Sequence, residues 1–164
     1  MKSVQSIPSK ILTRSQLLTE VKRWRLKNNR IVFTNGVFDI LHEGHIASLS
    51  EAATYGTVLI TAVNSDASVK RLKGPGRPVN TENARALVLA ALVMTDAVVI
   101  FEEDTPLELI KAVLPDVLVK GGDYSVDQIA GAKEVLANGG SVKLAAIIEG
   151  ISTTGIIQRM KTQY

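Results

Sequence analysis

The sequence predicts a doubly wound α/β domain, in which helices cover both faces of a parallel sheet. Short runs rich in β-branched residues alternate along the chain with segments of helical spacing. The runs are almost continuously apolar, as expected of strands buried on both faces. The 164 residues, 46% hydrophobic and 21% charged, suit one globular domain. We therefore expect a single domain over residues 1–164, with an ordered core over about 11–161 and a flexible N-terminus.

The predicted strands and helices follow one another in a regular order. Strands are expected at residues 31–36, 57–63, 96–101, 115–122 and 141–148. Helices are expected at about 13–24, 44–56, 81–94, 105–114 and 125–140, and from Ser152 to the end. Strands that alternate with helices in this way are joined by right-handed crossovers into a parallel sheet.

Local signals mark where several of these elements begin and end. Thr13 and Gln16 have the spacing of a capping box, which predicts the start of the first helix. Thr105 and Glu108 repeat this spacing ahead of a later helix. Residues 64–80 are polar, basic and rich in glycine and proline, so they predict a loop with at most one helical turn.

Chemically distinctive residues follow the ends of the predicted strands. The carboxyl ends of parallel strands meet at one edge of a sheet, and ligands bind there, near a reversal in strand order. We expect this edge to gather two histidines, a basic loop, a lysine-glycine turn and a serine-threonine run: His42 and His45, Lys70–Arg77, Lys120–Asp123 and Ser152–Thr154.

The stretch HEGH places His42 and His45 three residues apart at the entry of a predicted helix, so both side chains lie on one face. Gly44 between them removes a side chain that would stop a nucleotide from lying across the turn. Two imidazole N–H groups can hold oxygens that gain charge during phosphoryl transfer. Paired histidines can also bind zinc, but no carboxylate or cysteine triad accompanies them, so we expect no metal bound by protein ligands.

The run Ser152–Thr154 opens the last predicted helix. A helix N-terminus offers unpaired N–H groups and a partial positive charge, which suit phosphate oxygens. The sequence has no Walker A motif and no G-x-G-x-x-G after its first strand. A phosphate ligand must therefore be held by the histidines and this helix rather than by either glycine-rich loop.

The composition narrows the class of partner. A net charge of +3 with only 4% aromatic residues favours a small polyanionic ligand over nucleic acid, because single-strand binders need stacking aromatics. The absence of cysteine excludes disulfides and is compatible with the reducing cytoplasm. No apolar run approaches the roughly 20 residues that span a bilayer, and no signal peptide is evident, so we expect no membrane partner.

Several stretches together resemble one known family. HEGH is the signature of the HxGH nucleotidyltransferase superfamily, and the closer similarity is to the adenylyltransferase domains of ADP-heptose synthases. It covers about residues 11–161 and rests on these stretches: TNGVFDILHEGH, KGPGRPVN, FEEDTPLELI, KGGDY and EGISTTG. The order of these motifs makes the resemblance more specific than HEGH alone.

The resemblance implies a Rossmann-like nucleotidylyltransferase fold and a definite reaction. AMP would pass from ATP to a heptose 1-phosphate by direct in-line displacement, giving ADP-heptose and pyrophosphate for lipopolysaccharide cores. Mg²⁺ would be carried with ATP, and the enzyme would be cytoplasmic. Bifunctional members of the family carry a sugar kinase domain upstream, so this chain resembles the stand-alone transferase.

The same resemblance assigns roles to individual residues. It implies catalytic roles for His42, His45 and Lys73, and contacts with the substrate phosphate for Lys73 and Arg85. The implied nucleotide-binding residues are Val37, Phe38, His42, Gly44, His45, Asp123, Glu149, Gly150, Ser152, Thr153 and Thr154. The chain departs from the family pattern at Glu43, where a proline or another small or apolar residue is usual, and in the segment AAIIEG.

Other interpretations stay open on sequence grounds. A cytidylyltransferase acting on glycerol 3-phosphate or a related polyol phosphate shares the HxGH and ISTT features. A nucleotide-binding domain without turnover would keep the same fold. Asp39 fits a structural role in the loop before His42. Apolar residues around Leu18 and Trp24 fit either an interface between copies of the chain or core packing.

Overall fold

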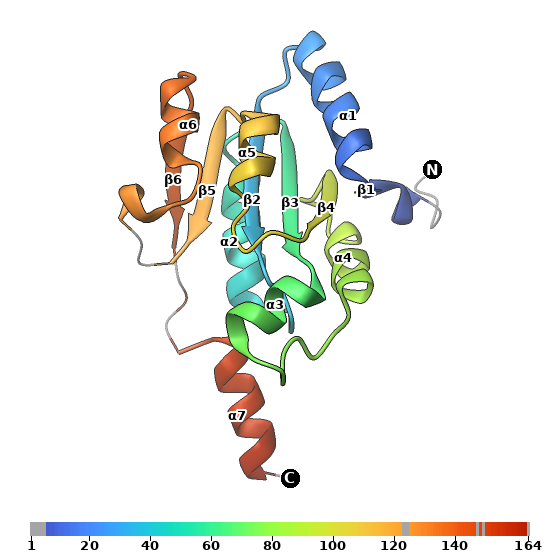
Figure 1. The fold of residues 1–164 in the computed structure, drawn as a ribbon, viewed down its shortest axis with the longest axis vertical. Helices are drawn as coiled ribbons and strands as arrows, with labels where there is room; N and C mark the ends of the chain where they lie inside the picture. Colours follow the sequence, from blue (N-terminus) through green and yellow to red (C-terminus); the bar gives the residue numbers. More distant parts are fainter. Residues whose placement is uncertain (1–5, 123–124, 147, 149, 164) are drawn as a thin grey trace.

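The computed structural model describes residues 6–122, 125–146, 148 and 150–163. In these parts of the chain a six-stranded, wholly parallel sheet lies between two layers of helices (Figure 1). The strands are β1 (Ile11–Leu12), β2 (Ile31–Gly36), β3 (Val58–Asn64), β4 (Ala97–Phe101), β5 (Val117–Gly121) and β6 (Ser141–Ala145). The predicted doubly wound α/β class is confirmed.

The order of the strands in the sheet is β1-β4-β3-β2-β5-β6. From β2 the chain moves through β3 to β4 in one direction, and then returns to the other side of β2 for β5 and β6. The order therefore reverses between β2 and β5. Because ligands of open α/β sheets bind outside the carboxyl ends of the strands at such a reversal, the topology directs attention to the residues after β2 and β5.

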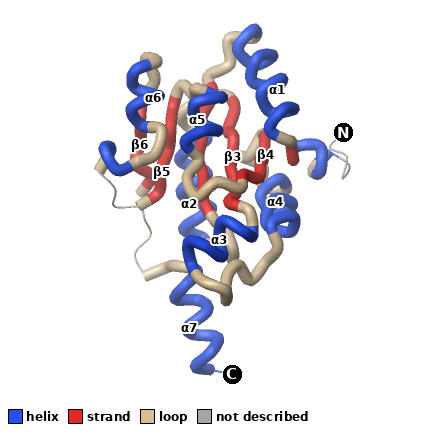
Figure 2. Tube along the Cα trace, in the orientation of Figure 1, coloured by secondary structure: helices blue, strands red, loops and turns tan. Residues whose placement is uncertain are grey.

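Helices cover both faces of the sheet (Figure 2). On one face α1 (Arg14–Leu26), α5 (Leu107–Val113) and α6 (Ala132–Ala137) bury apolar side chains against the strands. On the other face α2 (Glu43–Ala53) and α4 (Glu82–Ala90) do the same. The remaining helices, α3 (Asp66–Lys73) and α7 (Thr153–Gln163), lie at the edge where the strands end, and α7 projects away from the body (Figure 1).

Alternation along β2 connects the two apolar layers. Phe33 belongs to the cluster under α1, α5 and α6, whereas Val32 belongs to the cluster under α2 and α4. Both side chains are fully buried, as the continuous apolar run predicts. Leu18 and Trp24 are partly buried and pack against the first cluster, so within the single chain they contribute to core packing.

The structure confirms the capping box at Thr13 and Gln16 but contradicts two other predicted local features. Residues 66–73, expected to form at most one turn, form the eight-residue helix α3, because the Ser65 side chain accepts a hydrogen bond from the Ser68 N–H and caps it. Helix α5 begins at Leu107 with no side-chain cap, so the predicted box at Thr105 is wrong; its first helical bond runs from the Ile110 N–H to the Pro106 carbonyl.

The single helix predicted for residues 125–140 is divided in the structure. A short 3-10 helix (Val126–Gln128) comes first, capped by Ser125, and α6 follows. Gly131 between them has a φ of 85°, and a Cβ there would lie 2.6 Å from Cγ2 of Ile110. Close packing on α5 therefore interrupts the helix at a glycine. The two-residue strand β1 and the 3-10 turn before it (Pro8–Lys10) were not predicted. Within the described chain, every helix is too short or too polar to cross a membrane.

The capping box of α1 leads to a prediction about stability. Replacing Thr13 with alanine removes the acceptor for the Gln16 N–H and should lower the free energy of unfolding by about 1 kcal/mol. Thr19→Ala is the matched control, since the exposed Thr19 hydroxyl caps no helix end and donates only to the Ser15 carbonyl within the same helix. Urea unfolding followed by circular dichroism measures both. An equal loss in the two variants would contradict the capping role.

Candidate active site

A cavity of about 400 Å³ opens where β2, β5 and β6 end, at the reversal in strand order. Its walls come from the loop after β2, the start of α2, the last residue of α3, the ends of β5 and β6, and the start of α7. Of the predicted site residues, it is lined by Val37, Phe38, His42, Gly44, His45, Lys73, Ser152, Thr153 and Thr154. The structure thus brings together segments more than a hundred residues apart.

The remaining predicted residues have other positions. Gly150 has a φ of 78° and is not among the residues that line the cavity. Arg85 is buried and is also not among the residues that line the cavity. Asp123 and Glu149 lie outside the described residues, so their predicted roles stay predictions.

The two histidines form one unit at the start of α2. Their rings are stacked, with centroids 3.8 Å apart and an interplanar angle of 21°. His42 is the extended N-cap residue of the helix, and its carbonyl accepts the His45 N–H at 3.0 Å. Phe38 meets the His45 ring edge-on, with centroids 5.3 Å apart. The aromatic side chain thus holds the inner imidazole in place from the strand side.

Both imidazoles favour the neutral form. Burial lowers the pKa of His42 against a smaller opposing effect of Glu43. Burial, with repulsion from His42, lowers the pKa of His45 to about 4. The Nδ1 atoms of both rings are buried without a hydrogen-bond partner in the described chain. A neutral imidazole still carries one N–H, so each ring can donate to a phosphate oxygen without the cost of charging a buried group.

Gly44 is needed for the geometry of this pair. A Cβ at this position would lie 3.1 Å from Nδ1 and 3.2 Å from Cε1 of His42. These contacts are shorter than ordinary van der Waals distances, so a side chain at residue 44 would require the His42 ring to shift by a few tenths of an ångström. The absence of a side chain at Gly44 therefore allows the observed position of the His42 ring and also leaves space over the turn.

A buried carboxylate fixes the loop that carries the histidines. Asp39 accepts hydrogen bonds from Nε of Arg77 at 2.6 Å, from the Val79 N–H at 2.8 Å and from the Asn80 N–H at 2.9 Å. Burial alone raises its pKa, but these donors together hold the pKa below its ordinary value. Asp39 thus ties the loop after β2 to the loop before α4, which agrees with the structural role expected of it.

Arg85 is buried next to the loop that follows β2. Its guanidinium is fully buried and donates to the Val37 carbonyl at 2.6 Å, the Asn80 carbonyl at 3.0 Å and Oδ1 of Asp66 at 2.7 Å. Arg85 is not among the residues that line the cavity, so its predicted contact with the substrate phosphate stays a prediction. In the structure its side chain holds the backbone of Val37. The sequence could not show this, because its partners come from distant segments.

The anion-binding groups lie around the rest of the cavity. Lys73 is exposed at the end of α3 and borders the cavity. At the start of α7 the Ser152 hydroxyl accepts the Gly155 N–H at 3.0 Å, which confirms its capping role, and the Thr153 hydroxyl donates to the Ile40 carbonyl at 3.3 Å. The helix N-terminus is thereby fastened to the loop that carries His42.

Some residues of the wall were not among the predicted site residues: Asp39, Ser48, Arg77, Gly121, Gly122, Ala146, Ile148 and Ile151. Helical spacing could have indicated Ser48, which follows His45 by one turn. A Cβ on Gly121 would lie 3.3 Å from the Ser48 hydroxyl, so β5 approaches α2 closely here. In the described chain no group of three or more histidines and carboxylates has the arrangement of a metal site.

Comparisons with known proteins place these features in context. The model of the Cytidylyltransferase-like family matches residues 33–159. "Bifunctional protein HldE" of Koribacter versatilis is 55% identical over 160 residues, which are 96% of this chain and 33% of that protein. The protein of the same name from Vibrio cholerae is 54% identical over 151 residues, 92% of this chain and 32% of that protein. The chain therefore spans about a third of the length of the curated relatives it matches.

Two solved structures are similar in fold. The lipopolysaccharide core biosynthesis protein from Thermoplasma volcanium superposes with a TM-score of 0.62 at 25% identity, over 74% of this chain and 99% of that one. The pantoate-beta-alanine ligase from Francisella tularensis, complexed with beta-gamma ATP and beta-alanine, has a TM-score of 0.60 at 13% identity, over 92% of this chain and 76% of that one. The second likeness concerns the fold alone.

The buried histidine pair predicts an unusual titration. In the free protein the His45 imidazole should titrate near pH 4 rather than at its ordinary 6.5, and His42 should also titrate below 6.5. Between these values the folded state binds fewer protons than the unfolded state, so this pair makes stability fall as the pH drops from 6.5 to 4. Imidazole NMR resonances followed over pH, with and without a triphosphate, measure this. The triphosphate should raise both pKa values; two titrations near 6.5 in the free protein would contradict the burial.

Gly44→Ala tests the packing of the His42 ring. We expect nucleotide affinity to fall severalfold, because the new Cβ forces the imidazole to shift. Titration calorimetry with a non-hydrolysable ATP analogue measures the affinity, and the melting temperature reports on the fold. Gly76→Ala is the control, since a Cβ there meets no atom within 4 Å. Unchanged affinity for Gly44→Ala would show that the ring position is unimportant.

Proposed function

Because the chain belongs to the cytidylyltransferase-like family of nucleotidyltransferases, we propose that it transfers the AMP group of ATP to a heptose 1-phosphate, giving ADP-heptose and pyrophosphate. The observation that carries this proposal is the stacked pair of His42 and His45 in a cavity at the switch point of the sheet. A helix N-terminus and Lys73 border the same cavity. The histidines, the lysine and the helix N–H groups together form a set of hydrogen-bond donors that suits a polyphosphate.

The proposed reaction needs no nucleophile from the protein. An oxygen of the sugar phosphate, already ionised at neutral pH, attacks the α-phosphorus of ATP. The bond from this phosphorus to the bridging oxygen of the β-phosphate breaks, and pyrophosphate leaves with that electron pair. Holding the two anions in line can lower the activation barrier by about 7–11 kcal/mol through positioning alone. Mg²⁺ enters as the magnesium complex of ATP, since it prefers phosphate oxygens and water.

Each part of the cavity has a place in this proposal. His42 and His45 hold triphosphate oxygens and stabilise the charge that develops on them. The N–H groups at the start of α7, with Ser152, Thr153 and Thr154, hold the β- and γ-phosphates. Lys73 offsets the repulsion between the α-phosphate and the incoming phosphate. Contacts with the nucleotide are assigned to the backbone at Val37 and Phe38, to the open turn at Gly44 and to Gly150. Asp123 and Glu149 are included on the basis of the sequence resemblance.

The identity of the acceptor rests on the motifs and on the relatives. KGPGRPVN and KGGDY resemble the ADP-heptose synthase domains. One structural relative is named for lipopolysaccharide core biosynthesis, which calls for sugar precursors. We accordingly place the reaction in the cytoplasm, with ATP and a sugar 1-phosphate as partners. The description of the matching family, Cytidylyltransferase-like, favours CTP as the alternative nucleotide. The acceptor in that alternative is glycerol 3-phosphate or a related polyol phosphate.

Pyrophosphate release distinguishes these functions. Purified protein with Mg²⁺ is given ATP or CTP, each with heptose 1-phosphate or glycerol 3-phosphate. We expect release only with ATP and the heptose. Release with CTP and glycerol 3-phosphate would keep the mechanism and replace the substrates. Nucleotide binding without release from any pair would indicate a binding domain.

His42→Ala tests the catalytic role of the pair. We expect kcat to fall well over tenfold, because a donor to the transferred phosphate is lost. The fold should persist, since Nδ1 of His42 has no partner in the described chain whose loss would destabilise it. Steady-state kinetics and thermal melting measure the two effects. An unchanged kcat would remove His42 from the chemistry.

A further inference from the structure

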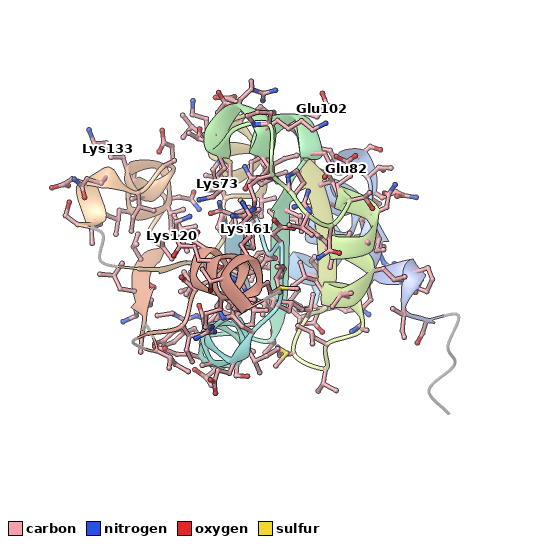
Figure 3. The ribbon with its side chains drawn as sticks, turned by 90° about the horizontal axis from the view of Figure 1, so that it is seen from below. Lys73, Glu82, Glu102, Lys120, Lys133 and Lys161 are labelled. Atoms are coloured by element: carbon pink, nitrogen blue, oxygen red, sulfur yellow. The ribbon has the colours of Figure 1, made fainter. Side chains whose placement is uncertain are left out.

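One wall of the active-site cavity comes from the segment between β6 and α7. In the described sheet β6 is an edge strand, and its last residue, Ala145, pairs with Gly121 of β5. Beyond it, Ala146, Ile148 and Ile151 line the cavity and form what we call the β6–α7 wall. Figure 3 looks onto this edge of the sheet, with α7 pointing toward the viewer. Because the sheet ends at β6, the backbone of this wall needs hydrogen-bond partners from other elements.

Glu51 of α2 supplies the first of these partners. Its Oε2 atom accepts a hydrogen bond from the Ala146 N–H at 2.9 Å. Its other carboxylate oxygen, Oε1, accepts a hydrogen bond from the hydroxyl of Tyr55 at 2.7 Å. One oxygen of the carboxylate therefore holds the wall, and the other holds the carboxylate itself in place.

The apolar core in turn fixes the position of Tyr55. Its ring is partly buried and packs against the cluster under α2 and α4. The ammonium group of Lys143, on β6, lies 6.0 Å from the centroid of the ring. The hydrogen bond to Glu51 raises the pKa of the Tyr55 phenol, so the hydroxyl remains the donor of this bond at neutral pH. The core thus positions Tyr55, and Tyr55 positions Glu51.

The far end of the wall is attached to the same part of the molecule. Thr153, at the start of α7, donates to the Ile40 carbonyl at 3.3 Å. Ile40 precedes His42 in the loop, and Glu51 follows His45 on α2. Both attachments therefore belong to the loop and helix that carry the histidines. The placement of the β6–α7 wall relative to the histidine pair depends on these two hydrogen bonds.

We propose that Glu51 is a positioning residue for nucleotide binding, which holds the β6–α7 wall in one place relative to the histidine pair. The inference rests on the proposed function and goes beyond it, because it gives a role to a residue outside the cavity. Glu51 is not among the residues that line the cavity, so it acts through Ala146 rather than by touching a ligand. When this hydrogen bond is lost, the wall must be ordered as the nucleotide binds, and the affinity falls.

The experiment compares nucleotide affinity and steady-state kinetics in Glu51→Ala, Glu51→Gln and wild type. Titration calorimetry uses a non-hydrolysable analogue of the nucleotide that wild type binds. We expect Glu51→Ala to weaken binding and raise KM for the nucleotide about fivefold, with kcat within about twofold, because the wall contacts ground state and transition state alike. Glu51→Gln should recover most of the loss, since its amide oxygen can accept the Ala146 N–H while its NH2 group donates to the Tyr55 oxygen.

Glu20→Ala is the matched control. Glu20 is a partly buried carboxylate on α1 that accepts a hydrogen bond from Arg23 at 2.7 Å, and neither residue lines the cavity. This variant loses a comparable interaction and should change neither KM nor kcat. Melting temperatures separate loss of the fold from displacement of the wall. Equally weak binding by Glu20→Ala and Glu51→Ala would overturn the inference.

Tyr55→Phe extends the test and takes the place of Glu51→Ala if that variant fails to fold. The change keeps the packed ring and removes the hydroxyl that orients Glu51. We expect KM for the nucleotide to rise about twofold to threefold. Added to Glu51→Ala, the change should have no further effect, because Tyr55 acts through Glu51. An unchanged KM for Tyr55→Phe, or fully additive effects in the double variant, would contradict the proposed chain of contacts.

The outcomes separate this inference from the proposed function. If wild type releases pyrophosphate and Glu51→Ala binds the nucleotide as tightly as wild type, the positioning role is overturned and the function stands. An equal loss in Glu51→Gln and Glu51→Ala also overturns the positioning role. If wild type binds a nucleotide without releasing pyrophosphate, and Glu51→Ala binds it more weakly, the function fails and the positioning role stands. If wild type binds no nucleotide, both fail.

Discussion

Two buried ion pairs hold the loop on which the whole site depends. Asp39 with Arg77 joins the loop after β2 to the segment before α4. Arg85 of α4 pairs with Asp66 at the start of α3 and donates to the Val37 carbonyl in the same loop. Burying such charges is costly unless they are paired and their remaining hydrogen bonds are made. Both conditions are met, since backbone N–H groups complete Asp39 and backbone carbonyls complete Arg85. The paired charges offset the free-energy cost of desolvation, and their directional bonds fix the loop in one conformation.

The fixed loop has a direct chemical consequence. Arg85 holds the Val37 carbonyl, and Val37 lines the cavity. The same loop leads to His42, the extended N-cap of α2. A shift of this loop would therefore move the histidines and this part of the cavity wall together. When two anions react without a protein nucleophile, catalysis depends mainly on how accurately they are positioned. A rigid loop at this place would therefore favour the reaction, although burying its charged groups costs free energy.

Local interactions explain which features could be predicted from sequence. The strands follow from continuous apolar runs, and the capping box of α1 from two side chains three residues apart. The HEGH stretch indicated the histidine pair for the same reason. Gly131 divides a predicted helix where Ile110 packs against it, and Arg85 donates to Val37 and Asp66, which spacing along the chain does not reveal. Such partners are 19 or more residues away in sequence, where spacing carries no signal.

The reversal in strand order also leaves a cavity on each side of the backbone at the end of β2. At the end of β2 the chain leaves toward α2 on one face, while the opposite face stays accessible beside β3 and β5. The backbone after β2 is then a thin wall with a donor-lined cavity on each side. Lys73 borders both cavities, so its ammonium group is available to an anion on either side of this wall.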